Sequence, residues 1–268
     1  MNCSEMIRDL RSRLGLSQME LAEQLEVTFA TVNRWENNRS KPAPAAMQQL
    51  IELCRRCNLQ IIENDGDYII KAIKEDTAYF EREEERISKR KALELFDTGL
   101  IDTFEVGTFK GLAQIHGFLF GEIYDFAGKM RTVNIAKGNF RFAPVMYLKA
   151  ALDNIEKMPQ DTFDHIIEKY VEMNVAHPFR EGNGRSTRIW LDAILKKEIG
   201  QVIDWSKVDK EDYLLAMERS PVKDVEIKVL LNAALTDQIH DREVYMKGID
   251  ASYKYEGYNV YKTEDLTD

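Results

Sequence analysis

Residues 177–188 read HPFREGNGRSTR and bring a histidine, an acid, two glycines around an asparagine, and two arginines into one short stretch. The preceding VEMNVA continues a helix that Pro178 must end, and STRIWLDAILKK begins the next helix. Gly182 and Gly184 flank Asn183 at the start of that second helix, where backbone N–H groups and the helix dipole favour an anion. The pattern predicts a turn that binds phosphate.

Charged side chains beside this turn extend the prediction to a polyphosphate. Arg185 and Arg188 are three residues apart, so both guanidinium groups leave one helix face toward the glycines. Glu181 stands next to them, and one acid suffices for Mg²⁺, which completes its shell with phosphate oxygens and waters. His177 is the only group in the stretch that can accept a proton near neutral pH. Together these residue types predict a nucleotide phosphate cradle with a base beside it. A Walker-type P-loop is excluded, because its GxxxxGK[ST] spacing is missing.

Composition limits the class of protein that positions these residues. The chain has 268 residues, 44% of them apolar, and a formal charge of −9, which describes one or two globular domains. It has no run of about 18 apolar residues and no apolar secretory segment at its start, so we expect a cytoplasmic protein with no membrane partner. Residues 1–60 hold eight Lys or Arg and seven Asp or Glu, a net charge of +1. The remainder holds 29 Lys or Arg and 39 Asp or Glu, a net charge of −10. This asymmetry indicates two parts with different partners.

The first part has apolar residues spaced by three and four, which predicts four or five helices. Ser17 and Glu20 form a capping box at the start of one helix, and Thr28 caps the next, which buries Val32 and Trp35. A turn in LQIIENDGDYIIKAI then predicts a hairpin at about 59–73 that ends this domain.

The stretch LSQMELAEQLEVTFATVNRWENNRSKP resembles the phage-repressor type of helix-turn-helix across about the first 58 residues. The resemblance implies DNA as a partner, a homodimer on two half-sites, and an internal pair between Arg11 and Glu36. Glu26 replaces the glycine usual in the turn and requires a strained backbone there. A helical module that only scaffolds or dimerises is the alternative, since a charge of +1 attracts phosphate weakly. The residues that the resemblance places on DNA are Gln18, Thr28, Phe29, Ala30, Asn33 and Arg34.

The remainder divides into regions at 74–91, 92–240 and 241–268. Residues 74–91 carry mixed charges without Gly or Pro and predict a solvated helical connector. From 92 onward the pattern is again helical, interrupted by KMRTVNIAKGNFRFAP, whose alternating apolar residues predict a short, exposed hairpin flap. Its open edge could accept an extended segment of another protein. The flap residues expected to dock a target are Val133, Asn134, Ile135, Lys137, Gly138, Asn139 and Phe140.

HPFREGNGRSTR resembles, position for position, the signature of the Fic family: His, any residue, Phe, any residue, acid, Gly-Asn-Gly-Arg, two residues, Arg. The resemblance extends upstream through FKGLAQIHGFLFGEIYDFAGKMRTVNIAKGNFRFAP and covers about 92–240, followed by a tail at 241–268. It implies an all-α bundle with one hairpin. The expected fold is therefore mainly α: a helix-turn-helix bundle with a short hairpin, then the all-α Fic bundle with its β-hairpin flap.

The resemblance implies transfer of AMP from ATP, with Mg²⁺, to a Tyr, Thr or Ser hydroxyl of a target protein. His177 would take the hydroxyl proton and Glu181 would hold the metal. Phe179 would pack beneath the loop, and Arg188 would grip the γ-phosphate. The remaining residues that it places on the phosphates are Gly182, Asn183, Gly184 and Arg185.

Other activities remain open. A kinase-like branch of the family carries Lys where Gly184 stands, and another branch transfers phosphocholine, so Gly184 favours AMP transfer. Outside the enzymes, the alternative is a transcriptional repressor whose second domain only senses ATP, although sensing needs no base such as His177.

Family members are often inhibited by a helix with Ser or Thr, three residues, Glu, then Gly or Asn. SYKYEG matches fully at Ser252, Glu256 and Gly257, whereas TAYFER at 77–82 lacks the final small residue. We therefore expect Glu256 to form a bidentate pair with Arg188 where the γ-phosphate would bind.

Overall fold

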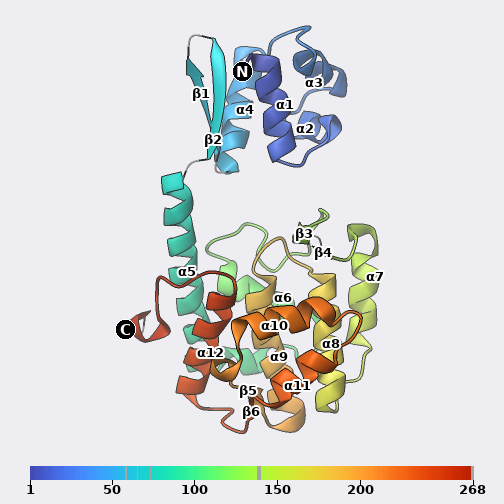
Figure 1. The fold of residues 1–268 in the computed structure, drawn as a ribbon, viewed down its shortest axis with the longest axis vertical. Helices are drawn as coiled ribbons and strands as arrows, with labels where there is room; N and C mark the ends of the chain where they lie inside the picture. Colours follow the sequence, from blue (N-terminus) through green and yellow to red (C-terminus); the bar gives the residue numbers. More distant parts are fainter. Residues whose placement is uncertain (58, 65, 73, 138–139, 267–268) are drawn as a thin grey trace. The chain divides into compact units, whose positions relative to one another are not determined.

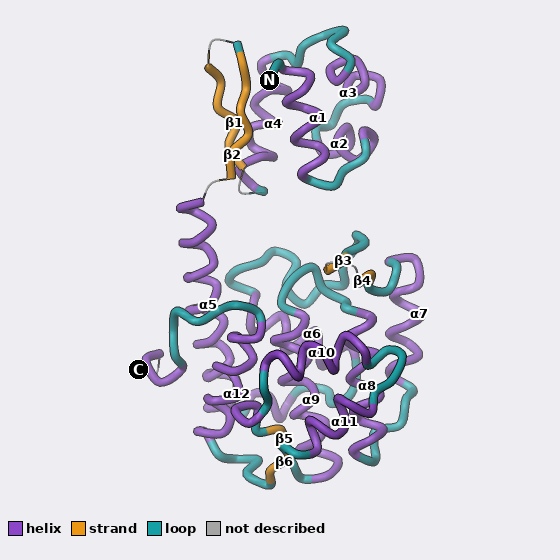
Figure 2. Tube along the Cα trace, viewed as in Figure 1, coloured by secondary structure: helices purple, strands orange, loops and turns teal. Residues whose placement is uncertain are grey.

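A computed structural model of the chain describes residues 1–57, 59–64, 66–72, 74–137 and 140–266. Two compact units form, Met1–Phe80 and Glu81–Asp268. Both are built mainly from helices, as predicted, with strands confined to short antiparallel pairs (Figures 1 and 2). None of the described helices is long and apolar enough to cross a membrane.

The first unit is a helical bundle with one hairpin. Ser17 accepts a hydrogen bond from the backbone of Glu20 and the Glu20 side chain accepts one in return, so the predicted capping box is confirmed. Thr28 likewise caps the following helix. The elements are α1 (Cys3–Arg13), α2 (Gln18–Gln24), α3 (Phe29–Glu36), α4 (Pro44–Arg56), β1 (Leu59–Asn64) and β2 (Asp67–Ala72).

Three further predictions about this unit are also confirmed. Glu26, between α2 and α3, has a φ of 52°, which an L-residue adopts only under strain. Arg11 Nε lies 2.6 Å from Oε1 of the buried Glu36, so this pair fixes α1 to the end of α3. The hairpin β1–β2 pairs Leu59 with Ala72 and falls where the sequence predicts it.

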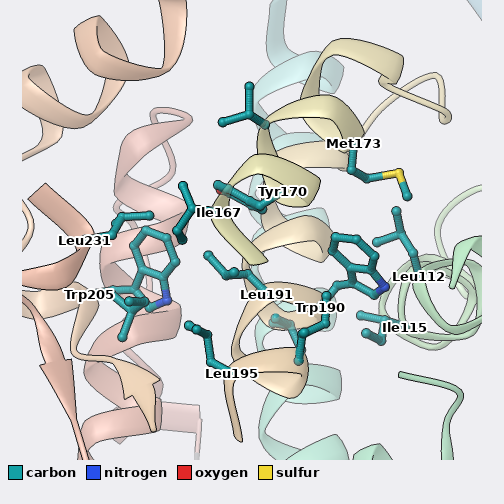
Figure 3. Close-up of a cluster of buried hydrophobic side chains, with 14 of the residues drawn as sticks. Leu112, Ile115, Ile167, Tyr170, Met173, Trp190, Leu191, Leu195, Trp205 and Leu231 are labelled. Atoms are coloured by element: carbon teal, nitrogen blue, oxygen red, sulfur yellow. The ribbon is translucent and has the colours of Figure 1, made fainter. Parts of the chain in front are cut away.

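The second unit surrounds α9, whose buried side chains point in several directions. In Figure 3, Trp190 lies on the side of α6 and α8, whereas Leu191 lies on the side of Trp205. A helix buried this thoroughly holds its first turn, and so the predicted phosphate turn, in a fixed place. The elements up to α9 are α5 (Lys74–Asp97), η1 (Leu100–Thr103), α6 (Phe109–Phe120), β3 (Ala136–Lys137), β4 (Phe140–Arg141), α7 (Val145–Glu156), α8 (Phe163–Ala176) and α9 (Asn183–Ile199).

The chain after α9 packs against it and adds a pairing that the sequence does not predict. Val202 pairs with Thr236, and Ile203 with Leu235, in a short sheet that is separate from the expected flap. Strands of two residues each leave no periodic pattern to recognise. The elements are β5 (Val202–Ile203), η2 (Trp205–Lys207), α10 (Lys210–Arg219), α11 (Val225–Asn232), β6 (Leu235–Thr236), α12 (Arg242–Tyr255) and η3 (Thr263–Leu266).

The predicted connector is helical, but the prediction that it is solvated is wrong for its second half. Glu84, Glu85 and Lys89 of α5 are buried. Lys89 Nζ lies 3.0 Å from Glu85 and donates to Oδ1 of Asp250 on α12 at 3.0 Å. Glu85 accepts from the backbone N–H groups of 260 and 261. The charges that suggested a solvated face are instead neutralised by one another and covered by the segment after α12.

Candidate active site

His177 ends α8 in a left-handed backbone conformation. Its φ is 49° and its ψ is 65°, and its N–H donates to the carbonyl of Met173 at 3.0 Å. Pro178 cannot continue the helix, so the chain turns sharply here. A histidine in this conformation is strained by about 1 kcal/mol or more, a cost that recurs at functional sites.

The imidazole of His177 is oriented by two neighbours. Nδ1 lies 3.3 Å from the carbonyl oxygen of Asn174, and because a carbonyl can only accept, Nδ1 carries the proton. The ring stacks on Phe142 with the centroids 3.7 Å apart and the planes inclined by 19°. In this tautomer Nε2 is the nitrogen with a lone pair, which a general base requires.

Arg131 ties this histidine to the flap. The buried guanidinium donates to the backbone carbonyls of Ala176 at 3.1 Å and His177 at 2.8 Å, at the end of α8. It also donates to the carbonyls of Val133 at 2.8 Å and Ala143 at 2.5 Å, on either side of the flap. Burial lowers the pKa of Arg131. One side chain therefore fixes the position of the flap relative to His177.

The turn between α8 and α9 is held from inside by Asn183. Its Oδ1 accepts from the N–H of Phe179 at 2.9 Å, and its Nδ2 donates to the carbonyl of the same residue at 2.8 Å. The Phe179 side chain is fully buried beneath the loop, where the family resemblance places it. Since the Asn183 amide is engaged with Phe179, its backbone N–H is the group left to serve a phosphate.

His116 holds the other side of this loop and was not predicted as a site residue. Its Nδ1 accepts from the N–H of Gly128 at 2.9 Å, and its Nε2 donates to the carbonyl of Glu181 at 2.8 Å. The ring stacks on Phe179 at 3.8 Å between centroids. Burial lowers the pKa of His116 from 6.5 to about 4, so the ring is neutral near pH 7.

The two glycines of the motif are required for different reasons. Gly182 caps α9 with a φ of 75°, and a Cβ there would come within 2.6 Å of the Phe120 ring. Gly184 is helical, but a Cβ on it would clash with Oε1 of Glu256. The first N–H groups of α9 have no partners within the helix, which is the arrangement that the predicted anion site requires.

Arg185 is fully buried among acids and aromatic rings. Its Nη2 lies 2.7 Å from Glu84, and its Nε lies 2.9 Å from Oε2 of Glu256. The guanidinium also lies over the rings of Phe120 at 4.7 Å and Tyr258 at 4.6 Å. Burial opposes the charge, but Glu256 and the other neighbours outweigh it and hold the pKa of Arg185 well above its ordinary value. Glu84 lies in the predicted connector, and no local sequence signal marks it.

Arg188 meets the predicted inhibitory segment. Its Nε donates to Oγ of Ser252 at 2.6 Å, and its Nη2 donates to the carbonyl of Ser252 and to Oε1 of Glu256, both at 2.9 Å. Glu256 thus gives one oxygen to Arg188 and the other to Arg185, whereas the sequence predicts a bidentate pair with Arg188 alone. Gly257 follows with a φ of 97°, which ends α12.

Glu181, the predicted metal ligand, directly precedes Gly182, the N-cap of α9. Its side chain is 53% exposed, its Oε1 accepts from the N–H of Gly182 at 3.0 Å, and the same oxygen lies 3.4 Å from Arg185. Within the described residues, no group of three or more His, Cys, Asp or Glu could hold a metal ion. A cation here would therefore depend on the ligand's own oxygens.

The flap forms where the sequence predicts it. Residues 136–137 pair with 140–141, and Asn134 Oδ1 accepts from the N–H of Val145, which fixes the flap to the start of α7. Val133 and Asn134 are exposed, and Ile135 is half-buried. Gly138 and Asn139 lie outside the described residues, and of Lys137 and Phe140 only the backbone is described.

In the first unit, α3 presents part of the predicted DNA-contact set. Phe29 is 49% exposed, and Ala30, Arg34 and the cap residue Thr28 are also exposed. The two remaining members contact each other, since Asn33 Nδ2 donates to Oε1 of Gln18 at 3.2 Å. Gln18 in turn donates to the buried Glu36 at 2.6 Å. This network fixes both side chains at the start of α2 and the middle of α3.

Two segments of the chain match known protein families. Residues 108–195 match the Fic/DOC family, and residues 7–62 match a helix-turn-helix family. The chain is 29% identical over 210 residues to the protein adenylyltransferase VbhT of Bartonella schoenbuchensis, which covers 69% of this chain and 43% of that protein. It is 27% identical over 138 residues to the probable protein adenylyltransferase Fic of Salmonella typhimurium. That match covers 47% of this chain and 68% of the Salmonella protein. The chain thus spans less than half the length of VbhT.

Solved structures of low sequence identity share the fold of the second unit. The type IV secretion system effector protein BepA matches with a TM-score of 0.51 and 19% identity, over 68% of this chain and 69% of that chain. The N-terminal FIC domain of the Bep8 protein from Bartonella sp. 1-1C matches with a TM-score of 0.50 and 14% identity, over 61% and 88%. At these identities the likeness is one of fold.

Proposed function

Because the chain carries a Fic/DOC family domain and a helix-turn-helix domain, we propose that it is a protein adenylyltransferase that transfers AMP from ATP to a target protein. The observation that carries the proposal is the position of His177, at the end of α8 and immediately before the glycine turn that begins α9. The proposed base and the proposed anion site thereby lie close together in the chain. The naming of VbhT and of the Salmonella relative as adenylyltransferases supports the same reaction.

The reaction is a displacement at the α-phosphorus of ATP. The hydroxyl oxygen of a target Tyr, Thr or Ser bonds to that phosphorus as its bond to the bridging oxygen breaks, and pyrophosphate leaves. The hydroxyl proton passes to Nε2 of His177, whose tautomer is set by Asn174. Phosphoryl chemistry of this kind needs mainly positioning and charge neutralisation, which the helix N-terminus and the arginines supply.

The phosphates would lie on the first turn of α9. The backbone N–H groups of Asn183 and Gly184 would donate to them, and Arg185 and Arg188 would neutralise their charge. Gly182 is needed so that the turn can form against Phe120. Asn183 contributes through the loop shape that its side chain maintains.

The exposed carboxylate of Glu181 fits Mg²⁺, since one carboxylate next to a phosphate site is a usual protein contribution to this ion. When bound with ATP, Mg²⁺ would neutralise charge on the α- and β-phosphates. The flap would align the target by main-chain hydrogen bonds along its open edge. Arg131 would keep that edge in register with His177.

The enzyme would be held inactive by Glu256. Two arginines of the cradle lie against three carboxylates, from Glu84, Glu181 and Glu256, so the site carries no net positive charge for a phosphate. Glu256 also occupies the guanidinium of Arg188 that would otherwise bind the γ-phosphate. A γ-phosphate would be repelled there, and ATP could bind only in a pose unsuited to in-line attack.

Labelled ATP tests the activity directly. Because Glu256 would inhibit the wild type, the full chain is tested with Glu256→Gly, and incubation with α-labelled ATP is expected to leave label on this protein or on a target in a lysate. Labelling from γ-labelled ATP instead would indicate phosphoryl transfer. If neither label is transferred, the remaining alternative is a protein that only senses ATP.

A second function, DNA binding by the first unit, is favoured by the exposure of Phe29, Ala30 and Arg34 on α3. The unit would bind a palindromic operator as a dimer, and such binding would regulate its own gene. Fluorescence anisotropy with upstream DNA is expected to show affinity that falls as salt rises. Arg34→Ala should weaken it, and Arg219→Ala, at an exposed position on α10 of the second unit, should not.

A further inference from the structure

The flap and its surroundings are positively charged in a chain that is otherwise acidic. Residues 127–152 contain no Asp or Glu. Removing their five cations from the 37 of the chain leaves 32 Lys and Arg against all 46 Asp and Glu, or −14 for the rest. The five cations are Lys129, Arg131, Lys137, Arg141 and Lys149.

Most of this charge is presented to solvent. Arg131 is buried and used by backbone carbonyls, but Lys129, Arg141 and Lys149 are exposed. Arg141 lies on β4 of the flap and Lys149 on α7, which follows the flap directly. Arg180, exposed in the motif loop, adds another positive charge three residues after His177.

Few acids oppose these cations. Asp125 precedes the region, and its backbone carbonyl accepts from Lys129 at 2.8 Å. Glu181 is the proposed metal ligand, and Asp153 lies further along α7. Glu122 is engaged by Lys91 of α5 at 3.1 Å. The exposed cations of the flap and the start of α7 therefore have no carboxylate among residues 127–152 to neutralise them.

Exposed apolar side chains lie among the charges. Met146 is 78% exposed and Tyr147 is 59% exposed, both in the first turn of α7. Val133, at the entry to the flap, is also exposed. Soluble surfaces rarely gather large apolar side chains without a partner, so this combination favours a binding surface.

The shape of the flap fixes the form of the partner. β3 pairs only with β4 in the described residues, so the pair has open edges that can accept an extended chain. Phe142, next to β4, stacks on His177, so a segment on this edge would pass beside the base.

We infer that the target of this enzyme presents its hydroxyl on an extended, acidic segment that carries apolar side chains, and that Lys129, Arg141, Lys149 and Arg180 select it. The inference rests on the proposed AMP transfer and adds the class of substrate. A protein segment fits better than a nucleic acid, because a strand edge and exposed aliphatic side chains recognise a polypeptide.

The test uses the full chain with Glu256→Gly and peptides of one length, each with a central tyrosine between leucines. Their flanks are acidic, neutral or basic. Self-labelling from α-labelled ATP is measured first, because the absence of self-labelling would refute the proposed AMP transfer itself. With self-labelling present, kcat/KM for the acidic peptide should exceed that for the basic peptide by at least about tenfold, and the ratio should shrink as salt rises.

Charge reversal identifies the surface. Arg141→Glu with Lys149→Glu should abolish or invert the preference for the acidic peptide. The matched double variant Lys197→Glu with Lys223→Glu, at exposed positions on α9 and after α10, should keep it. The inference would be overturned if the enzyme labels itself but labels no peptide. It would also be overturned if the enzyme labels the acidic and basic peptides equally well. Binding of a short oligothymidylate that only the flap variant loses would overturn it too, because the surface would then serve nucleic acid.

Discussion

Glu256 accepts a hydrogen bond from Nη2 of Arg188 at 2.9 Å across 68 residues of sequence. The carboxylate is fixed there by the end of α12, whose Ser252 receives two further hydrogen bonds from the same arginine. Arg188 is therefore already bound to a protein anion at the position proposed for the γ-phosphate. The first prediction concerns the removal of that anion.

Glu256→Gly should raise self-labelling from α-labelled ATP by at least about tenfold, because it removes the carboxylate that Arg185 and Arg188 share and leaves His177 and Glu181 unchanged. Glu243→Gly, at an exposed position on the same helix, should leave labelling as it is. Adding Arg188→Ala to Glu256→Gly should lose the gain. If Glu256→Gly behaves as the wild type and Glu81→Gly activates, the inhibitor lies in α5.

His177→Ala should abolish AMP transfer and leave the affinity for ATP nearly unchanged, because the phosphates are bound by the turn and the arginines. Transfer is measured with α-labelled ATP in the Glu256→Gly background, and affinity by calorimetry. His165→Ala is the control, since the His165 side chain is 40% exposed and pairs with Asp161. Transfer by the His177 variant at the parental rate would contradict the assigned base.

Arg131→Gln should lower kcat for AMP transfer by at least about tenfold while changing the KM for ATP little, because the guanidinium positions the flap and His177 and not the nucleotide. It should also cost about 1–3 kcal/mol of stability, since backbone carbonyls lose their donors. Arg131→Lys should recover stability in part and kcat less, because an ammonium cannot span both sides of the flap. A purely structural role would give the same kcat in every variant that remains folded.

The pKa of His116, lowered by burial from 6.5 to about 4, makes stability depend on pH. Between these values the unfolded chain binds a proton that the folded chain does not, so this contribution to stability is lost as pH falls. Burial of Asp192 raises its pKa to about 7 and acts in the opposite direction. Urea unfolding is compared between wild type and His116→Gln. Both proteins contain Asp192, so its contribution cancels in the difference between them. On acidification from about pH 7 to pH 4, wild type should lose as much as about 3 kcal/mol more than the variant, and parallel curves would refute this.

The residues that could be predicted from sequence lie close together in the chain. The turn after His177, the caps at Ser17 and Thr28, and the flap each depend on a few neighbouring residues, whose conformational preferences are local. Even the strained backbone of Glu26 follows from the residue type that stands in the turn.

The rest of the site depends on contacts that no local pattern encodes. In the sequence, Glu84 is one of many charged residues typical of a surface helix. In the structure it pairs with Arg185, about a hundred residues later in the chain. The carbonyls that Arg131 binds belong to backbone, which carries no sequence signal. The division of Glu256 between two arginines likewise depends on how α12 packs on α9.

Since α12 and α9 belong to one polypeptide, each proposed active site is synthesised together with one copy of its own inhibitor. The effective concentration of Glu256 at Arg188 is set by the packing of α12 and does not change with dilution or with the level of expression. A separately encoded inhibitor can be outnumbered or degraded first, which shifts the ratio of free to inhibited enzyme. Here stoichiometry offers no such control, so a physiological signal would have to act on the packing of α12 or compete for the arginines.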